Sequence, residues 1–96
     1  MYEIRQTDRF SKWLSKLKDN RARAKITIRI QRASLGNLGD YHSVGEGVSE
    51  FRISEGKGYR VYFTVKDQEI IFLLCGGDKS SQDSDIKLAK KMRLEV

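Results

Sequence analysis

The chain has no proline, and it has only one cysteine and one histidine, Cys75 and His42, among its 96 residues. A lone cysteine excludes a disulfide framework, and one cysteine with one histidine falls short of the ligands that a structural zinc site needs. No apolar run approaches the roughly 20 residues of a membrane span, and the N-terminus carries no apolar signal-peptide core. We therefore expect no metal, no cofactor and no membrane partner, in a soluble, cytoplasmic protein.

Charge is plentiful, and it is unevenly spread. The length predicts a single domain, residues 1–96, with one modest core. The net charge is +6, and ten of the 19 lysines and arginines but only three of the 13 acids fall in residues 1–35. Such a basic N-terminal third can attract phosphate backbones or an acidic protein partner, or it can be a solvated helical face.

The first half of the chain predicts a short strand and two helices. Residues 2–6 alternate as a strand, and Thr7 or Asp8 can cap the helix that follows. Residues 21–35 fit both the strand period and the helix period, but a glycine stands where a helix C′ residue belongs, and no turn signal interrupts them. We expect a helix there, with Ile28 off its apolar side. The first helix has its apolar residues at helical spacing: Phe10, Trp13, Leu14 and Leu17.

The second half predicts a glycine-rich loop, three strands and a last helix. The loop covers residues 36–47, and the strands cover 48–54, 59–65 and 69–75, the last being apolar on both faces and therefore central. Gly76 and Gly77 are expected to end that strand. Ser80 with Asp83 resembles a capping box for a helix that runs to about Leu94. The order predicts an α+β fold, with two N-terminal helices packed on a twisted antiparallel sheet and a C-terminal helix.

Strand alternation separates a core wall from a polar face. Because side chains alternate across a strand, the two strands of the central hairpin share one apolar face and present one polar face. Two arginines and a tyrosine on an open sheet face can hold a phosphate and stack on a base. Alternatively, the face is solvated and holds a cross-strand Glu–Arg pair. The residues of this expected open face are Glu50, Arg52, Arg60, Tyr62 and Thr64.

Other residues have a functional and a structural interpretation. Residues 75–80 look like a phosphate loop, but the spacing is wrong because Asp78 separates Gly77 from Lys79; the turn either holds an anion or is simply a capped connection. His42 is either solvated or a proton-transfer group. Cys75 is expected in the core, and Trp13 as the anchor between helix and sheet.

Three stretches resemble a known family. They are Val44–Ile53, then Gly58–Phe63 (Gly-Tyr-Arg-Val-Tyr-Phe), and then Leu73–Asp83, which contains Cys-Gly-Gly-Asp-Lys-Ser. Together with the pattern of the first helix and the arginine-rich second helix, they resemble the RelE/ParE superfamily, in its HigB-like, addiction-module killer branch. The resemblance implies two N-terminal helices on a twisted antiparallel sheet, and it favours a helix over residues 21–35.

The resemblance also implies a function and a set of partners. It implies the toxin of a type II toxin–antitoxin pair, a ribosome-dependent mRNA endonuclease that acts on mRNA in the ribosome. A cognate antitoxin, expected to be a helix-turn-helix protein, neutralises such a toxin, and only the complex binds operator DNA. Alternatives are a ParE-like, non-enzymatic inhibitor of DNA gyrase, or an inactive toxin that serves only as an antitoxin-binding corepressor.

The same resemblance suggests roles for individual residues. Arg60, by its Gly-Tyr-Arg context, and Arg52 on the neighbouring strand are expected to bind phosphate and stabilise the transition state. Tyr62 is a stacking or proton-transfer candidate, and Lys57 and Lys79 are supporting cations. Several family members carry a functional Tyr or His near the C-terminus, and this chain has neither after Cys75. The general base is therefore open between His42 and a lysine of shifted pKa.

Overall fold

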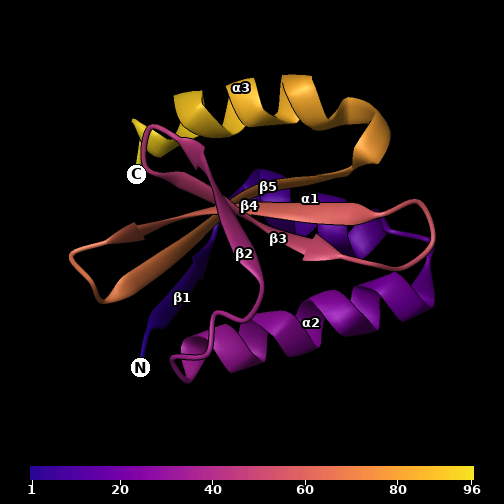
Figure 1. Cartoon of the computed structure of the whole chain (residues 1–96), viewed down its shortest axis with the longest axis horizontal. Coiled ribbons are helices and arrows are strands. Elements are labelled where there is room, and N and C mark those ends of the chain that lie inside the picture. Colours follow the sequence, from indigo (N-terminus) through magenta and orange to yellow (C-terminus); the bar gives the residue numbers. More distant parts are fainter.

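The computed structural model describes all 96 residues, as three helices and a five-stranded sheet (Figure 1). Helices α1 and α2 lie on one face of the sheet, and α3 lies on the other. In chain order the elements are β1 (Glu3–Gln6), α1 (Asp8–Lys16), α2 (Asn20–Ser34), β2 (Tyr41–Gly45), β3 (Val48–Ile53), β4 (Tyr59–Lys66), β5 (Ile70–Asp78), a 3₁₀ turn (Lys79–Ser81) and α3 (Gln82–Arg93). The α+β fold class is confirmed.

The sheet differs from the prediction at both edges. Its strand order is β1-β5-β4-β3-β2, and β1 pairs with β5 in parallel, whereas all other neighbours are antiparallel. The expected loop over residues 36–47 contains the edge strand β2, which pairs with β3. A turn with positive φ at Gly45, Glu46 and Gly47 joins the two strands. Gly45 and Gly47 therefore belong to a hairpin turn, and only residues 36–40 of the expected loop remain outside a strand or that turn.

The two N-terminal helices begin at side-chain caps. The Thr7 side chain accepts a hydrogen bond from the backbone N–H of Phe10, and Asp19 does the same for Ala22, which satisfies donors that a helix start leaves free. The ambiguous residues 21–35 are helical, with Ile28 exposed as expected. Gly36 follows at φ 97°, a left-handed conformation that glycine adopts without strain.

The main core lies between the sheet and helices α1 and α2. Phe10 of α1 and Ile26 of α2 are fully buried against β3, β4 and β5. Trp13 packs against this cluster, with ring centroids 5.8 Å from Phe10 and 6.4 Å from Tyr59, and so anchors α1 on the sheet as predicted. Burying one large apolar side chain contributes about 1.5–3 kcal/mol, so Phe10 and Ile26 each stabilise the packing of their helix on the sheet.

Two predictions about β5 are wrong. Gly76 and Gly77 do not end the strand, because β5 continues to Asp78. A Cβ on Gly76 would overlap the indole of Trp13, and one on Gly77 would overlap the Asp85 carboxylate, so these glycines permit close approach. Regular alternation predicts Cys75 on the face of Ile71 and Leu73, opposite Leu74. A bulge in the β4–β5 pairing breaks that alternation, so Cys75 is buried on the same face as Leu74.

The start of α3 also differs from the prediction, and the position of this helix determines which side chains of the opposite sheet face are covered. The Asp78 side chain accepts from the backbone N–H of Ser80 and caps the 3₁₀ turn, so the predicted capping box is absent. Helix α3 then crosses the sheet on the face opposite α1 and α2 (Figure 1). None of the three helices combines the length and the apolar character that a membrane span requires.

Candidate functional site

The predicted polar residues do share one sheet face. Across the hairpins, His42 of β2 lies opposite Glu50 of β3, Glu50 lies opposite Tyr62 of β4, and Arg52 lies opposite Arg60. Directly opposed residues project from the same side of a sheet. These five residues, His42, Glu50, Arg52, Arg60 and Tyr62, form what we call the Glu50 cluster.

The expectation that this face is open is wrong. Helix α3 covers it, and Ala89 packs with Val48, Tyr62, Leu74 and Cys75 in a second buried cluster. Glu50 and Tyr62 are fully buried, and Arg60 and Thr64 keep only 7% and 6% of their surface exposed. The physical reason is that the apolar side of α3 needs a partner, and this face supplies the apolar surface that α1 and α2 leave uncovered.

Glu50 holds both arginines of the cluster. Its Oε2 atom lies 2.6 Å from Nε of Arg52 and 3.4 Å from Nε of Arg60. The Arg60 side chain is 9% exposed, whereas the Arg52 side chain is 47% exposed. The predicted alternative, a cross-strand Glu–Arg pair, is therefore present between Glu50 and Arg60. The hydrogen bond to Glu50 also raises the pKa of Arg52, which keeps that guanidinium charged.

The buried side of the cluster is incompletely hydrogen-bonded. Three fully buried atoms have no hydrogen-bond partner: Oε1 of Glu50, Nε of Arg60 and the Tyr62 hydroxyl. Burial raises the pKa of Tyr62, and the nearby carboxylates of Glu50 and Asp85 raise it further. The phenol therefore stays protonated and is available as a hydrogen-bond donor. Buried polar groups without partners are rare in native proteins, so three adjacent ones mark this place as unusual.

On its open side the cluster joins a cationic groove. A depression of about 420 Å³ between α2 and β3 has Arg52 on one wall and Lys25, Arg29 and Arg32 on the other. Arg29 is structural, because it donates to the backbone oxygens of Arg52 and Asp40 and lies over the Phe51 ring at 5.0 Å. The groove thus brings together the basic second helix and the hairpin arginine, which the sequence suggested separately.

The remaining predicted site residues lie at the rim or outside the cluster. His42 is 47% exposed on the edge strand, with its Nε2 3.1 Å from Oδ1 of Asp40. Lys57 in the β3–β4 turn and Lys79 in the 3₁₀ turn are both exposed, at the end of the sheet where Tyr59 pairs with Asp78. The structure therefore brings together His42, Arg52, Arg60 and Tyr62, and leaves the two lysines at the far end of the hairpin.

Two carboxylates of this region were not predicted as site residues. Glu50 was assigned only to a surface pair, although its position opposite both Tyr62 and His42 makes it the centre of the cluster. Asp85 of α3 accepts a hydrogen bond from Ser81 at 2.5 Å and lies over Gly77. The apolar spacing of the last helix was the available signal, because a helix with such a side must cover something. An acid buried beside the two arginines could then be inferred, because a buried positive charge needs a counterion.

Comparison with sequence families and relatives gives two matches. The family described as phage-derived protein Gp49-like matches residues 12–93. An uncharacterized protein of Haemophilus influenzae is 53% identical over 94 residues, which cover 98% of this chain and 95% of that protein.

Comparison with solved structures points to one fold. A double arginine-to-alanine mutant of the E. coli toxin RelE, in the free state, has a TM-score of 0.72 at 16% identity, covering 94% of this chain and 96% of RelE. RelE in the intact E. coli RelBE toxin–antitoxin complex has a TM-score of 0.67 at 16% identity, with coverages of 81% and 96%. Isolated RelE in its P21 form has a TM-score of 0.68 at 15% identity, with coverages of 91% and 98%. At these identities the likeness shows the fold.

Proposed function

The chain belongs to the Gp49-like family of phage-derived proteins, and on that premise we propose that it is the toxin of a toxin–antitoxin pair. The RelE fold supports this proposal, since the solved structures of that fold include a toxin alone and a toxin with its antitoxin. The motifs at Gly58–Phe63 and Cys75–Ser80 favour the HigB-like branch within the superfamily.

The proposed partner is a cognate antitoxin, a small helix-turn-helix protein with an acidic segment. The concentration of ten cations in residues 1–35, three of them at exposed positions of α2 (Arg21, Lys25 and Arg32), supports an acidic partner. Operator DNA would be bound only through the complex. Co-expression with the product of the adjacent reading frame should give a complex that survives purification in moderate salt, and a chain that purifies without it would contradict the partnership.

The proposed activity is cleavage of mRNA on the ribosome, which takes place in the cytoplasm. In this scheme His42 takes the proton from a 2′-hydroxyl, the 2′-oxygen attacks the phosphorus, and Tyr62 protonates the leaving 5′-oxygen. Arg52 and Arg60 stabilise the charge that develops on the phosphorane, and Lys57 and Lys79 contact flanking phosphates. The products are a 2′,3′-cyclic phosphate and a free 5′-hydroxyl, and proton return from His42 to Tyr62 completes the cycle.

The observation that carries this proposal is the incompletely bonded interior of the Glu50 cluster. Buried polar groups without a partner are rare, and catalytic sites, where charges share a desolvated place, are among the places where they occur. Burial adds a condition: Arg52 and His42 already reach solvent, whereas RNA can touch Arg60 and Tyr62 only after α3 moves off this face.

The test is to express the chain without its partner and to map mRNA 5′ ends. The parent chain should arrest growth and produce new ends within translated messages. Arg60→Ala should slow cleavage about 10²–10³-fold, the usual cost of removing one donor to a developing anion. Arg5→Ala is the matched control, because Arg5 is an exposed arginine on β1, outside the cluster. An Arg60→Ala chain as active as the parent would contradict the site assignment.

A second candidate function is a toxin that does not cleave RNA. Glu50 already neutralises both arginines, which favours this interpretation because a paired guanidinium has less charge to offer a phosphate. A gyrase inhibitor would arrest growth with intact mRNA and relaxed plasmids. An inactive corepressor would bind the antitoxin without arresting growth at all.

A further inference from the structure

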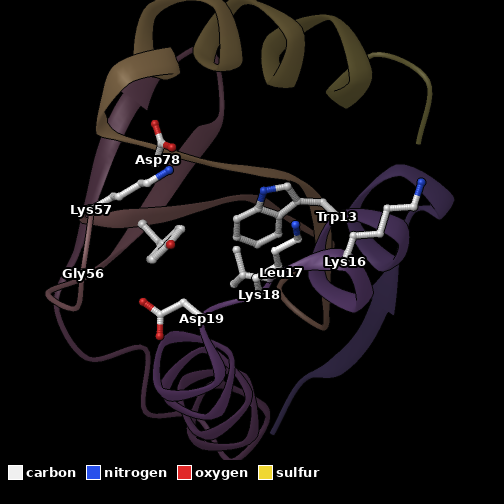
Figure 2. Close-up of a pocket in the computed structure, with 9 residues that line it drawn as sticks. Trp13, Lys16, Leu17, Lys18, Asp19, Gly56, Lys57 and Asp78 are labelled. Carbon is white, nitrogen blue, oxygen red and sulfur yellow. The ribbon is translucent and has the colours of Figure 1, made fainter.

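A cleft separate from the Glu50 cluster lies where the end of α1 meets the β3–β4 turn (Figure 2). Its volume is about 820 Å³, within the range of small-ligand sites. Trp13 and Tyr59 supply aromatic walls, and Lys18 and Lys57 supply cations from two different loops. None of the groups in the Glu50 cluster lines it.

The lysines of the cleft form no close ion pair, and its two carboxylates cap backbone N–H groups. Lys18 and Lys57 take part in none of the seven ion pairs of the chain. Asp19 instead caps α2 through the N–H of Ala22, and Asp78 caps the 3₁₀ turn. The hydrogen bonds from Ser80, with a contribution from Lys57, hold the pKa of Asp78 below its usual range. The cleft therefore has an excess of positive charge beside aromatic rings, with three lysines, Lys16, Lys18 and Lys57, against two carboxylates.

The shape of the cleft is fixed by the backbone. Gly76 lets the Trp13 indole lie directly on β5, and the edge contact with Tyr59 holds its orientation. At Gly56, which has a φ of 55°, a Cβ would come within 2.6 Å of the Asp19 carboxylate. Close approach at that glycine brings the β3–β4 turn, and with it Lys57, to the cleft. Figure 2 shows Lys57 beside Asp78 on one side of the cleft and Asp19 on the other.

We propose that this cleft binds a nucleotide of single-stranded RNA, with the base against Trp13 and the flanking phosphates on Lys18 and Lys57. Aromatic side chains beside backbone-tracking cations are the common feature of single-strand binding sites. An acidic peptide is the less favoured occupant, because Leu17 is the only aliphatic side chain in the lining and offers it little apolar surface. The inference rests on the proposed function for its ligand class, and it gives Lys57, already a proposed contact of the flanking phosphates, a cleft that also binds a base.

The chain carries its own reporter for this proposal, because Trp13 is its only tryptophan. Titration of the purified chain with a short oligouridine RNA should quench Trp13 fluorescence to saturation, since the base stacks on the indole. Inorganic polyphosphate, which has the charge without the bases, should leave most of the fluorescence unchanged. Binding is measured without cleavage, so an inactive chain that still quenches would count against the nuclease proposal and not against this one.

Variants test the two lysines. Lys18→Ala/Lys57→Ala should weaken RNA binding at least about tenfold and lower the slope of log affinity against log salt by about 1.4, for two lost phosphate contacts. Lys87→Ala/Lys91→Ala removes the same charge from exposed positions on α3 and should keep most of the parent affinity. Equal urea midpoints would show that both variants are folded.

Three results would overturn the proposal. The first is saturable RNA binding that leaves Trp13 fluorescence unchanged, or no binding at all. The second is an equal loss of affinity in the α3 control, which would mean that only net charge matters. The third is quenching by an oligoglutamate peptide that carries a leucine, with none by RNA, which would make the cleft a protein-docking site.

Discussion

Replacing Glu50 by glutamine should destabilise the fold strongly, although the two side chains have nearly the same size. Arg52 and Arg60 lie directly opposite each other on β3 and β4, and Glu50 is the anion that both contact, at 2.6 and 3.4 Å. Glu50→Gln keeps the shape and removes the charge, so Arg60 is left buried with no counterion and opposed by a second cation. Removing one partner of a buried ion pair costs about 3–5 kcal/mol, and like charges in register add to that cost.

A matched control exists in the same chain. Glu55 also contacts two cations, Arg21 at 3.4 Å and Lys25 at 2.8 Å, but both cations are exposed and Glu55 is itself partly exposed. Glu55→Gln should therefore cost less than about 1 kcal/mol. Urea unfolding followed by circular dichroism measures both variants. In thermal melts the Glu50 variant should lose on the order of 10 °C or more, given about 4–8 °C per kcal/mol for a domain of this size.

A double variant separates charge from packing. Glu50→Gln/Arg60→Met removes the stranded cation and should recover most of the stability that Glu50→Gln loses, because a hydrophobic replacement for a buried pair is often neutral. The reasoning is refuted if Glu50→Gln unfolds at the same urea concentration as Glu55→Gln. It is refuted equally if the double variant is no more stable than the single one, since the loss would then come from something other than the uncompensated arginine.

Three further predictions follow from other contacts. Gly76→Ala should lower the free energy of unfolding by about 1–3 kcal/mol, because the added methyl group would overlap the Trp13 indole. In a double-mutant cycle, Trp13→Leu in the same chain should reduce that loss. Losses that simply add would exclude the clash. Burial, with Asp85, raises the pKa of Cys75 to about 12, so the thiol should resist a disulfide reagent at pH 8. Since the raised pKa favours the protonated folded form, stability should fall between the ordinary thiol value of about 8.5 and pH 12, and a Cys75→Ala chain should lack that part of the pH dependence. Asp19→Ala should cost about 1 kcal/mol through loss of the α2 cap, measured by urea unfolding against Asp83→Ala, an exposed acid with no cap contact.

The elements that depend on local chemistry were predictable from the sequence. The cap at Thr7, the C′ glycine and the apolar spacing located α1 and α2, because each signal acts within a few residues. The alternation in the central hairpin also assigned each side chain of β4 to its face correctly up to Thr64. In these places local preference and tertiary packing agree.

What failed depends on contacts between distant segments. Gly76 and Gly77 look like a strand end in isolation, and only the positions of Trp13 and Asp85 explain why glycine is needed inside a strand. The bulge that turns Cys75 is a property of the β4–β5 pairing and leaves no mark in the sequence. The parallel pairing of β1 with β5 also joins segments that are far apart in the chain, so the local sequence does not predict it.

The candidate site was likewise predicted where it depends on local pattern and missed where it depends on distant contacts. Sequence and family resemblance placed Arg52, Arg60 and Tyr62 on one face, and the strand register agrees. They did not reveal that α3 covers that face, because the partner of an amphipathic helix cannot be read from the helix alone. The central role of Glu50 was missed for the same reason, since a glutamate between polar neighbours looks exposed until burial is known.

The most direct test of the account is cleavage by the purified chain. A labelled mRNA is incubated with the protein, with and without ribosomes that translate it, and the fragments are mapped. The account predicts cuts only in the presence of ribosomes, with 5′-hydroxyl ends, and a large loss of cutting in Arg60→Ala. An intact message on ribosomes, from a preparation that arrests growth when expressed, would contradict it.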